Sequence, residues 1–263
     1  MRRRTRHGAA AVGTCGALAV LCGAGVATPK PPAAHLAQEV AVVGASIADG
    51  MGAPPGGGWA ELLADDLGVR ADVSADPGAG FVARGVAKEG PMWRLLPALQ
   101  LDRVHPDVVL VQAGHNDVGE PLLPVIVSVT RLFEAIHTLT PDSVIGLISV
   151  FPTGDEPSAA ARTTDAAIVA AARTAVPDVF VFDPITGRWH FPRLRDGLHP
   201  TEAGHEWIAQ RLTGPLRDAL DPHQRNSPRR GPTWPDLLTL IFGNSMPDSR
   251  QNQGFLGVVT ANA

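Results

Sequence analysis

The chain has 263 residues, of which 44% are hydrophobic, and a formal net charge of −4 at pH 7. A chain of this length can bury a full core in one α/β domain with tails, without a disulfide or metal to stabilise it. The acidic balance argues against nucleic acid or an anionic membrane surface as the main partner, and without tyrosine the chain is poorly equipped for stacking on bases.

The N-terminus has the pattern of a secretory leader. Four arginines within positions 2–6 precede an uncharged run of Ala, Gly, Val and Leu over 9–26. Gly25-Val26-Ala27 then places small residues at the two positions that a signal peptidase recognises. We predict a signal peptide over 1–27, cleaved near Ala27, and a mature protein without a membrane span that is secreted or associated with the cell envelope. An uncleaved anchor is the alternative.

Cys15 and Cys22 are the only cysteines, and both lie in the predicted leader. A mature protein cleaved after Ala27 therefore has neither disulfides nor a cysteine nucleophile. Cleavage also removes four arginines, which changes the net charge from −4 to −8. Because neither a His-Glu-x-x-His pattern nor a Cys/His cluster remains, we expect no metal and no other cofactor.

Five apolar runs rich in β-branched residues follow a Pro- and Ala-rich linker at 28–38. They are Val40–Gly44, Val69–Ser74, Val108–Ala113, Val144–Phe151 and Val179–Asp183. Several are almost continuously apolar, as in strands buried on both faces of a parallel sheet, and helical patterns separate them. The alternation predicts an α/β domain over 39–220, a three-layer α/β/α sandwich with a five-stranded parallel sheet. The tail at 221–263 has no periodicity, and we expect it to be largely disordered.

Two of the predicted helices have a recognisable start. Ser158 is suited to cap an Ala-rich helix that ends before Pro177, and the last helix begins around Pro200-Thr201. Its inner side is formed by Trp207, Ile208, Leu212 and Leu216. We expect His205 on this helix to serve packing or capping rather than metal binding.

Gly44-Ala45-Ser46 follows the first predicted strand directly. In an open parallel sheet the ligand crevice lies at the carboxyl ends of the strands, so this serine is expected at its mouth. A serine on a strand-to-helix turn, with its N–H at a helix N-terminus, suits a nucleophile whose attack creates an oxyanion. By itself, however, a serine at this place is more typical of a helix cap.

Gly114-His115-Asn116-Asp117 follows the third predicted strand. Asn116 can direct its side-chain amide to the same crevice, although Gly, Asn and Asp are equally typical of a polar turn. His115 either lines the substrate cleft or faces solvent.

Asp196-Gly197-Leu198-His199-Pro200 precedes the last predicted helix. A carboxylate three residues before a histidine on one loop can accept the Nδ1 proton of the ring. That interaction leaves Nε2 free to act as a general base toward Ser46.

Together these segments resemble the SGNH/GDSL hydrolase family, whose four conserved blocks occur here in order. The blocks correspond to Val43–Ser46, Asp76–Phe81, Gly114–Asp117 and Asp196–His199. Trp59 and the segment Thr201–His205 are also typical surroundings in this family. The resemblance implies the flavodoxin-like fold of SGNH hydrolases and the activity of a serine esterase or lipase.

The resemblance also implies a role for each site residue. Ser46 is the nucleophile and an oxyanion-hole donor, His199 is the base and Asp196 orients it. Gly78 and Asn116 supply further oxyanion donors, with Gly80 as the alternative to Gly78. The family usually has Asp before the nucleophile, whereas this chain has Ala45, so we expect different hydrogen bonds around an otherwise intact triad.

The leading hypothesis is an exported serine hydrolase that cleaves carboxylic esters with short to medium acyl chains, or O-acyl sugars. The same triad could instead transfer an acyl group to a sugar or glycolipid of the cell envelope. A non-catalytic binding module on this fold is the third hypothesis. The expected partner is a small-molecule, lipid or glycan ester, and we expect a monomer.

Overall fold

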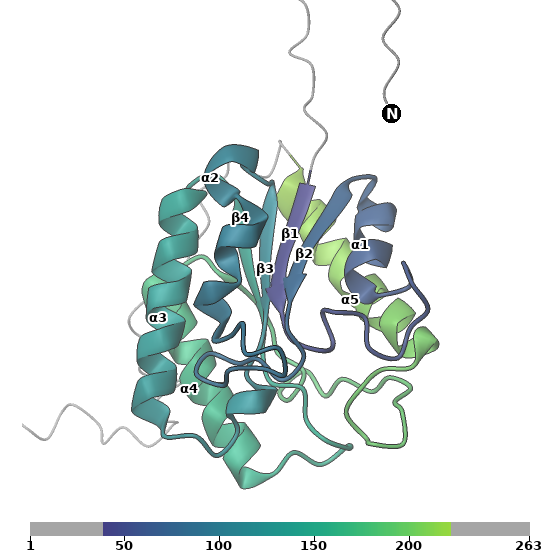
Figure 1. Cartoon of the computed structure of the whole chain (residues 1–263). Coiled ribbons are helices and arrows are strands. Elements are labelled where there is room, and N and C mark those ends of the chain that lie inside the picture. The colour runs from purple at the N-terminus through teal and green to yellow at the C-terminus, as the bar shows by residue number, and fades with distance from the viewer. Residues whose placement is uncertain (1–38, 222–263) are drawn as a thin grey trace, which may run out of the picture. The chain divides into compact units, whose positions relative to one another are not determined.

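A computed structural model describes residues 39–221 and contains five parallel strands in the order β2-β1-β3-β4-β5 (Figure 1). The strands are β1 (Glu39–Gly44), β2 (Arg70–Ala75), β3 (Val108–Gln112), β4 (Val144–Ile148) and β5 (Phe180–Phe182). The predicted α/β class and the five-stranded parallel sheet are confirmed. The predicted leader and linker, and the tail after Asp221, lie outside the described residues.

Helices cover both faces of this sheet. They are α1 (Trp59–Leu67), α2 (Leu101–Val104), α3 (Leu122–Leu139), α4 (Ala159–Ala175) and α5 (Glu202–Leu220), with 3₁₀ turns at Met92–Arg94, Leu96–Leu99 and His115–Asp117. Figure 1 shows α1 and α5 on one side of the sheet and α3 and α4 on the other. Side chains of β1 alternate accordingly: Val40 and Val42 pack with α1 and α5, whereas Ala41 and Val43 pack with α3 and α4.

The register of the central strands brings their carboxyl ends together. Gly44, the last residue of β1, lies beside Ala75 on β2 and Gln112 on β3. Ser46 therefore emerges at the same edge as the loops that follow β2 and β3. This edge is the place where a parallel sheet offers its ligand crevice.

The predicted cap of α4, Ser158, is present, and α5 has a cap of the same kind in Thr201. The hydroxyl of Ser158 accepts a hydrogen bond from the Ala161 N–H at 3.1 Å, and that of Thr201 accepts one from the Gly204 N–H at 3.3 Å. These bonds satisfy N–H groups that the first turns of α4 and α5 would otherwise leave unpaired.

Among the described residues, α3 is the one helix long and apolar enough to cross a membrane, with a mean hydropathy of 1.5. Its buried side chains, however, belong to the core between the sheet and α4. They are Val125, Val129, Leu132, Phe133 and Ile136. The core helix of a globular domain can have the same length and composition.

Asp165 on α4 is buried, and its carboxylate accepts a hydrogen bond from the Val150 N–H at 3.1 Å. Burial, with the neighbouring Asp183 carboxylate adding to it, raises the pKa of Asp165 to about 6 from an ordinary 3.8. The fold therefore favours the protonated carboxyl. Protonation of Asp165 therefore stabilises the fold relative to the unfolded chain at low pH. Its contribution to the free energy of unfolding is complete below the pKa of Asp in the unfolded chain and is lost as pH rises through about 6.

Asp165→Asn should remove this pH dependence, because the amide oxygen can still accept from Val150 but does not ionise. We expect the variant to gain stability relative to the wild type as pH rises, by about 3 kcal/mol at most. Urea unfolding at about pH 4.5 and about pH 7.5 measures the difference. If the variant and the wild type differ in free energy of unfolding by the same amount at both pH values, the role given to Asp165 is contradicted.

Candidate active site

Three predicted site residues form one hydrogen-bonded line. Ser46 lies just after β1, and its Oγ is 2.8 Å from Nε2 of His199. The other ring nitrogen of His199, Nδ1, is 2.7 Å from Oδ2 of Asp196. An imidazole held this way can take a proton from the serine hydroxyl while the carboxylate stabilises the resulting charge.

Asp196 is fixed by its own loop. Its Oδ1 accepts hydrogen bonds from the backbone N–H groups of Leu198, at 2.8 Å, and His199, at 3.0 Å. The bond from the His199 ring, followed by these two, lowers the pKa of Asp196 to about 2. The carboxylate is therefore ionised at neutral pH, and the proton between it and His199 stays on Nδ1.

The turn that carries Ser46 differs from the predicted strand-to-helix turn. Hydrogen bonds from the Asp49 N–H to the Ala45 carbonyl, at 2.9 Å, and from the Met51 N–H to the Ser46 carbonyl, at 3.0 Å, close a single turn. The helix α1 begins only at Trp59. Ser46 is therefore not a helix cap, because a glycine-rich loop separates it from the next helix.

Gln112 fixes this turn from the neighbouring strand. Its buried side-chain oxygen accepts hydrogen bonds from the N–H groups of Ala45, at 3.3 Å, and Ala48, at 3.1 Å. No sequence motif predicts a role for Gln112 in the site. Its one signal is that Gln112 is the single polar residue in the otherwise apolar strand β3.

The two glycines that compete for the oxyanion hole have different backbone roles. The Gly80 N–H donates to the carbonyl of Ala83 at 3.0 Å, so it is already bonded. Within residues 39–221 the N–H groups of Ser46 and Gly78 donate no hydrogen bond. Gly78 also has a φ of +80°, a conformation that favours glycine.

The side-chain amide of Asn116 donates one N–H to the carbonyl of Ala79, at 2.8 Å. This bond fixes the Asn116 amide beside Gly78, the residue before Ala79, and leaves the second N–H of the amide available. Ser46, Gly78 and Asn116 thus together offer three donors at the carboxyl edge of the sheet.

Asp117 shapes the loop after β2. Its buried carboxylate accepts hydrogen bonds from the N–H groups of Phe81, at 2.8 Å, and Val82, at 2.9 Å. A Cβ atom on Gly80 would collide with this carboxylate, so the glycine provides space for Asp117. Burial raises the pKa of Asp117, and the bonds from the backbone oppose that shift.

Asp117→Asn should loosen this loop, because it places an NH₂ group against backbone N–H donors. We expect the free energy of unfolding to fall by about 2 kcal/mol, the typical effect of a buried donor left without an acceptor. The midpoint of urea unfolding measures it. An unchanged midpoint would show that the carboxylate is not needed to hold the loop.

His115 is partly buried at the same edge. Its Nδ1 donates to the carbonyl of Phe151 at 2.9 Å, which leaves Nε2 as the acceptor of a neutral ring. Burial lowers the pKa of His115, and the proximity of His199 lowers it further, while the bond to Phe151 raises it. The ring is thus near His199, with its second nitrogen free for a substrate or for water.

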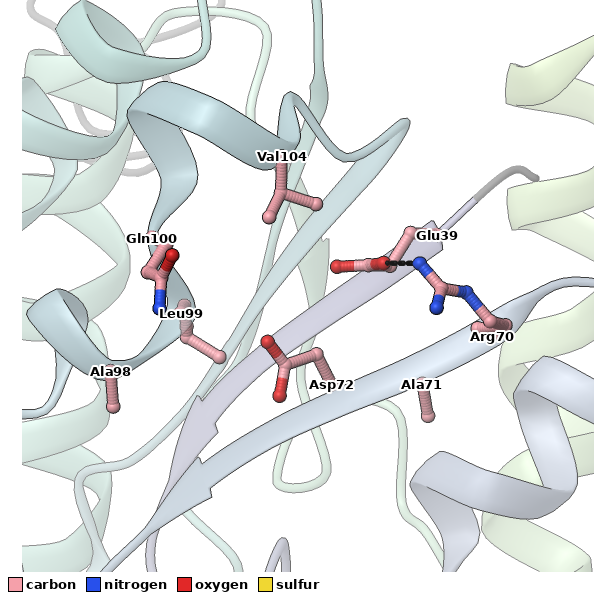
Figure 2. A pocket seen from close by; sticks show the side chains of 8 residues that line it. All are labelled: Glu39, Arg70, Ala71, Asp72, Ala98, Leu99, Gln100 and Val104. Atoms are coloured by element: carbon pink, nitrogen blue, oxygen red, sulfur yellow. Dashed lines mark hydrogen bonds and ion pairs between the residues drawn. The ribbon is translucent and has the colours of Figure 1, made fainter. Parts of the chain in front are cut away.

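A separate cavity of about 350 Å³ lies at the opposite end of the strands (Figure 2). It is lined by the first residues of β1 and β2, Glu39 and Arg70, whose side chains form an ion pair at 2.6 Å, together with Asp72 and Gln100. Ser46 follows the last residue of β1, so this cavity is not part of the triad site. Within residues 39–221 there is also no group of three or more acidic, His or Cys side chains that could hold a metal.

A Ser-His-Asp line at the carboxyl edge of a parallel α/β/α sandwich is the architecture of a serine hydrolase. The chain belongs to the GDSL-like lipase/acylhydrolase family, whose model matches residues 42–207. It is therefore a carboxylic ester hydrolase. A related protein is the GDSL lipase Rv0518 of Mycobacterium tuberculosis, 32% identical over 164 residues, which are 59% of this chain and 68% of the relative.

Solved structures share the fold at lower sequence identity. A family two carbohydrate esterase from Clostridium thermocellum, in complex with cellohexaose, matches with a TM-score of 0.56 and 21% identity over 74% of this chain and 67% of its own. A carbohydrate acetylesterase from Sinorhizobium meliloti matches with a TM-score of 0.57 and 12% identity over 70% of this chain and all of its own. These similarities support the fold and leave the substrate open.

Proposed function

We propose that this ester hydrolase is exported and that it acts through an acyl-enzyme on Ser46. One observation carries the acyl-enzyme mechanism: the continuous line from Ser46 through His199 to Asp196, with bonds of 2.8 and 2.7 Å. The proposal of export rests on the leader pattern over residues 1–27. Nucleophile, base and orienting carboxylate lie within hydrogen-bond reach of one another, as nucleophilic catalysis requires.

In the first half of the reaction, Ser46 Oγ attacks the ester carbonyl while its proton passes to Nε2 of His199. The N–H groups of Ser46 and Gly78 and the amide of Asn116 stabilise the oxyanion. The imidazolium then protonates the leaving alcohol, and the C–O bond of the ester breaks. In the second half, His199 takes a proton from water as its oxygen attacks the acyl carbonyl. The imidazolium then returns that proton to Ser46 Oγ as the acyl C–Oγ bond breaks and the acid leaves.

We infer an apolar acyl group from the side chains around the triad. Met51, on the Ser46 turn, is 40% exposed, and Val86, beside Gly78, is 79% exposed. Leu194, whose N–H bonds to the His199 carbonyl, is 37% exposed. Three exposed apolar side chains on separate site loops favour burial of a short to medium acyl chain over contact with free sugar hydroxyls.

A series of p-nitrophenyl esters from acetate to decanoate, compared with an acetylated oligosaccharide, tests the substrate. We expect kcat/KM to rise from acetate toward the medium chains and to exceed that for the sugar ester. A preference for the acetylated sugar would assign the enzyme to O-acyl sugars. Failure to turn over any ester would contradict acyl-enzyme hydrolysis.

Export is tested separately by expressing the full chain in a bacterial secretion host. We expect mature protein in the medium or envelope with an N-terminus near Thr28, as determined by intact mass. Retention of residues 1–27 would indicate an uncleaved anchor instead.

A further inference from the structure

His205 joins three segments of the site from a fully buried position on α5. Its Nδ1 accepts a hydrogen bond from the backbone N–H of Trp59, the first residue of α1, at 3.2 Å. Its Nε2 lies 3.0 Å from the carbonyl of Met51. One imidazole thus binds both ends of the segment 51–59, which links the Ser46 turn to α1.

Both partners dictate the tautomer of the ring. A backbone N–H can only donate, so Nδ1 carries no proton; a carbonyl can only accept, so Nε2 carries it. His205 therefore makes both bonds only when it is neutral. Burial lowers the pKa of His205 and His199 lowers it further, while the bond to Met51 and the carboxylate of Glu61 on α1 oppose this.

The segment that His205 binds is bonded directly to Ser46, and His205 itself is bonded to the loop that carries His199. The Met51 N–H donates to the Ser46 carbonyl at 3.0 Å, and the Met51 carbonyl accepts from His205. The His205 N–H donates to the Thr201 carbonyl at 2.9 Å, two residues after His199.

A close approach of the two loops shows how tightly they are packed at this point. Gly52 has a φ of +102°, and a Cβ there would collide with the carbonyl of Pro200, the residue after His199. The Ser46 turn and the His199 loop thus meet without room for a side chain at Gly52. A displacement of segment 51–59 would therefore change the position of Ser46 relative to His199.

We propose that His205 is a positioning residue that holds the Ser46 turn against α5 and so aligns Ser46 Oγ with Nε2 of His199. The inference rests on the proposed acyl-enzyme mechanism for its catalytic consequence, but not for the placement of segment 51–59. It gives His205 a role in the reaction without contact with the substrate.

Two variants test the proposal. His205→Leu removes both hydrogen bonds but keeps an apolar side chain in the core. We expect kcat to fall by about 10- to 100-fold with KM within a factor of about three, since displacement of a reacting group by about 1 Å can reduce a rate 100-fold. His205→Gln keeps a side-chain N–H for the Met51 carbonyl and should restore most of the lost kcat.

Thr213→Val is the matched control. Thr213 is buried two turns further along α5, and its hydroxyl contacts the Asp66 carboxylate of α1 at 3.1 Å. It therefore also joins α5 to α1, but away from the Ser46 turn. We expect Thr213→Val to lower the free energy of unfolding measured in urea, as His205→Leu does, and to leave kcat unchanged.

Amide hydrogen exchange of the peptide over 46–59 provides a readout independent of catalysis. His205→Leu should lose protection in this peptide, and Thr213→Val should retain it. Unchanged exchange, or a kcat in His205→Leu equal to that of Thr213→Val, would overturn the proposal. If the wild type hydrolyses no ester, the proposed mechanism fails, whereas the exchange experiment still decides whether His205 holds the turn.

Discussion

Ser46→Ala is expected to lower kcat for ester hydrolysis by about 10⁴-fold or more. The variant lacks the only oxygen within hydrogen-bond distance of His199 Nε2 among the described residues, so no acyl-enzyme can form. KM should change little, because the pocket and the oxyanion donors remain. Steady-state kinetics with the best p-nitrophenyl ester measures the loss.

The matched control is Ser74→Ala on β2. The Ser74 hydroxyl donates to the Leu95 carbonyl at 2.9 Å, so the substitution also removes one partly buried serine hydrogen bond. We expect it to retain kcat within a factor of about two. A Ser46→Ala enzyme with more than about 1% of wild-type kcat would contradict nucleophilic catalysis by Ser46, since triad serines contribute far more than that.

Asn116→Ala should give the second largest loss, about 10² to 10³ in kcat, which is typical for removal of one oxyanion-hole donor. The amide interacts with charge that develops only in the transition state, so KM should be nearly unchanged. Kinetics with the same ester measures both constants.

Asn116→Asp separates stabilisation of the oxyanion from support of the loop. It keeps the size of the side chain but replaces the donor with a carboxylate that repels an oxyanion, so kcat should fall at least as far as in Asn116→Ala. Thermal unfolding monitors the bond from Asn116 to the Ala79 carbonyl. A kcat within about threefold of wild type in both variants would remove Asn116 from the oxyanion hole, given the usual effect of such a donor.

The sheet could be predicted because its signal is local. Val108 to Val111 form one uninterrupted apolar run, and all four residues are buried in β3. Strand ends were predicted less closely: the run to Phe151 continues past the end of β4 at Ile148. Buried loop residues such as Phe151 are as apolar as strand residues, so composition alone does not show where hydrogen bonding between strands stops.

The proximity of Asp196 to His199 could also be predicted, since a spacing of three residues places both on one loop. Gln112 and His205 could not, because their partners are distant in sequence. Gln112 bonds to Ala45, 67 residues earlier, and His205 bonds to Met51, 154 residues earlier. Local patterns carry no information on such contacts, which depend on how the loops pack.

Backbone hydrogen bonds distinguish Gly78 from Gly80 as candidate oxyanion donors. Both glycines fit the spacing, but the Gly80 N–H is bonded to Ala83 and its Cα faces the Asp117 carboxylate. Sequence spacing alone does not show that Gly80 provides space for Asp117 whereas the N–H of Gly78 remains available.

The most direct test of acyl-enzyme catalysis on Ser46 is covalent labelling by an alkyl fluorophosphonate, followed by peptide mass mapping of the adduct. We predict one phosphonyl group per chain, located on Ser46, and labelling at least about 100-fold slower in His199→Ala, because the serine would lose its general base. Labelling of a different residue, or no adduct on intact protein that hydrolyses esters, would contradict the mechanism.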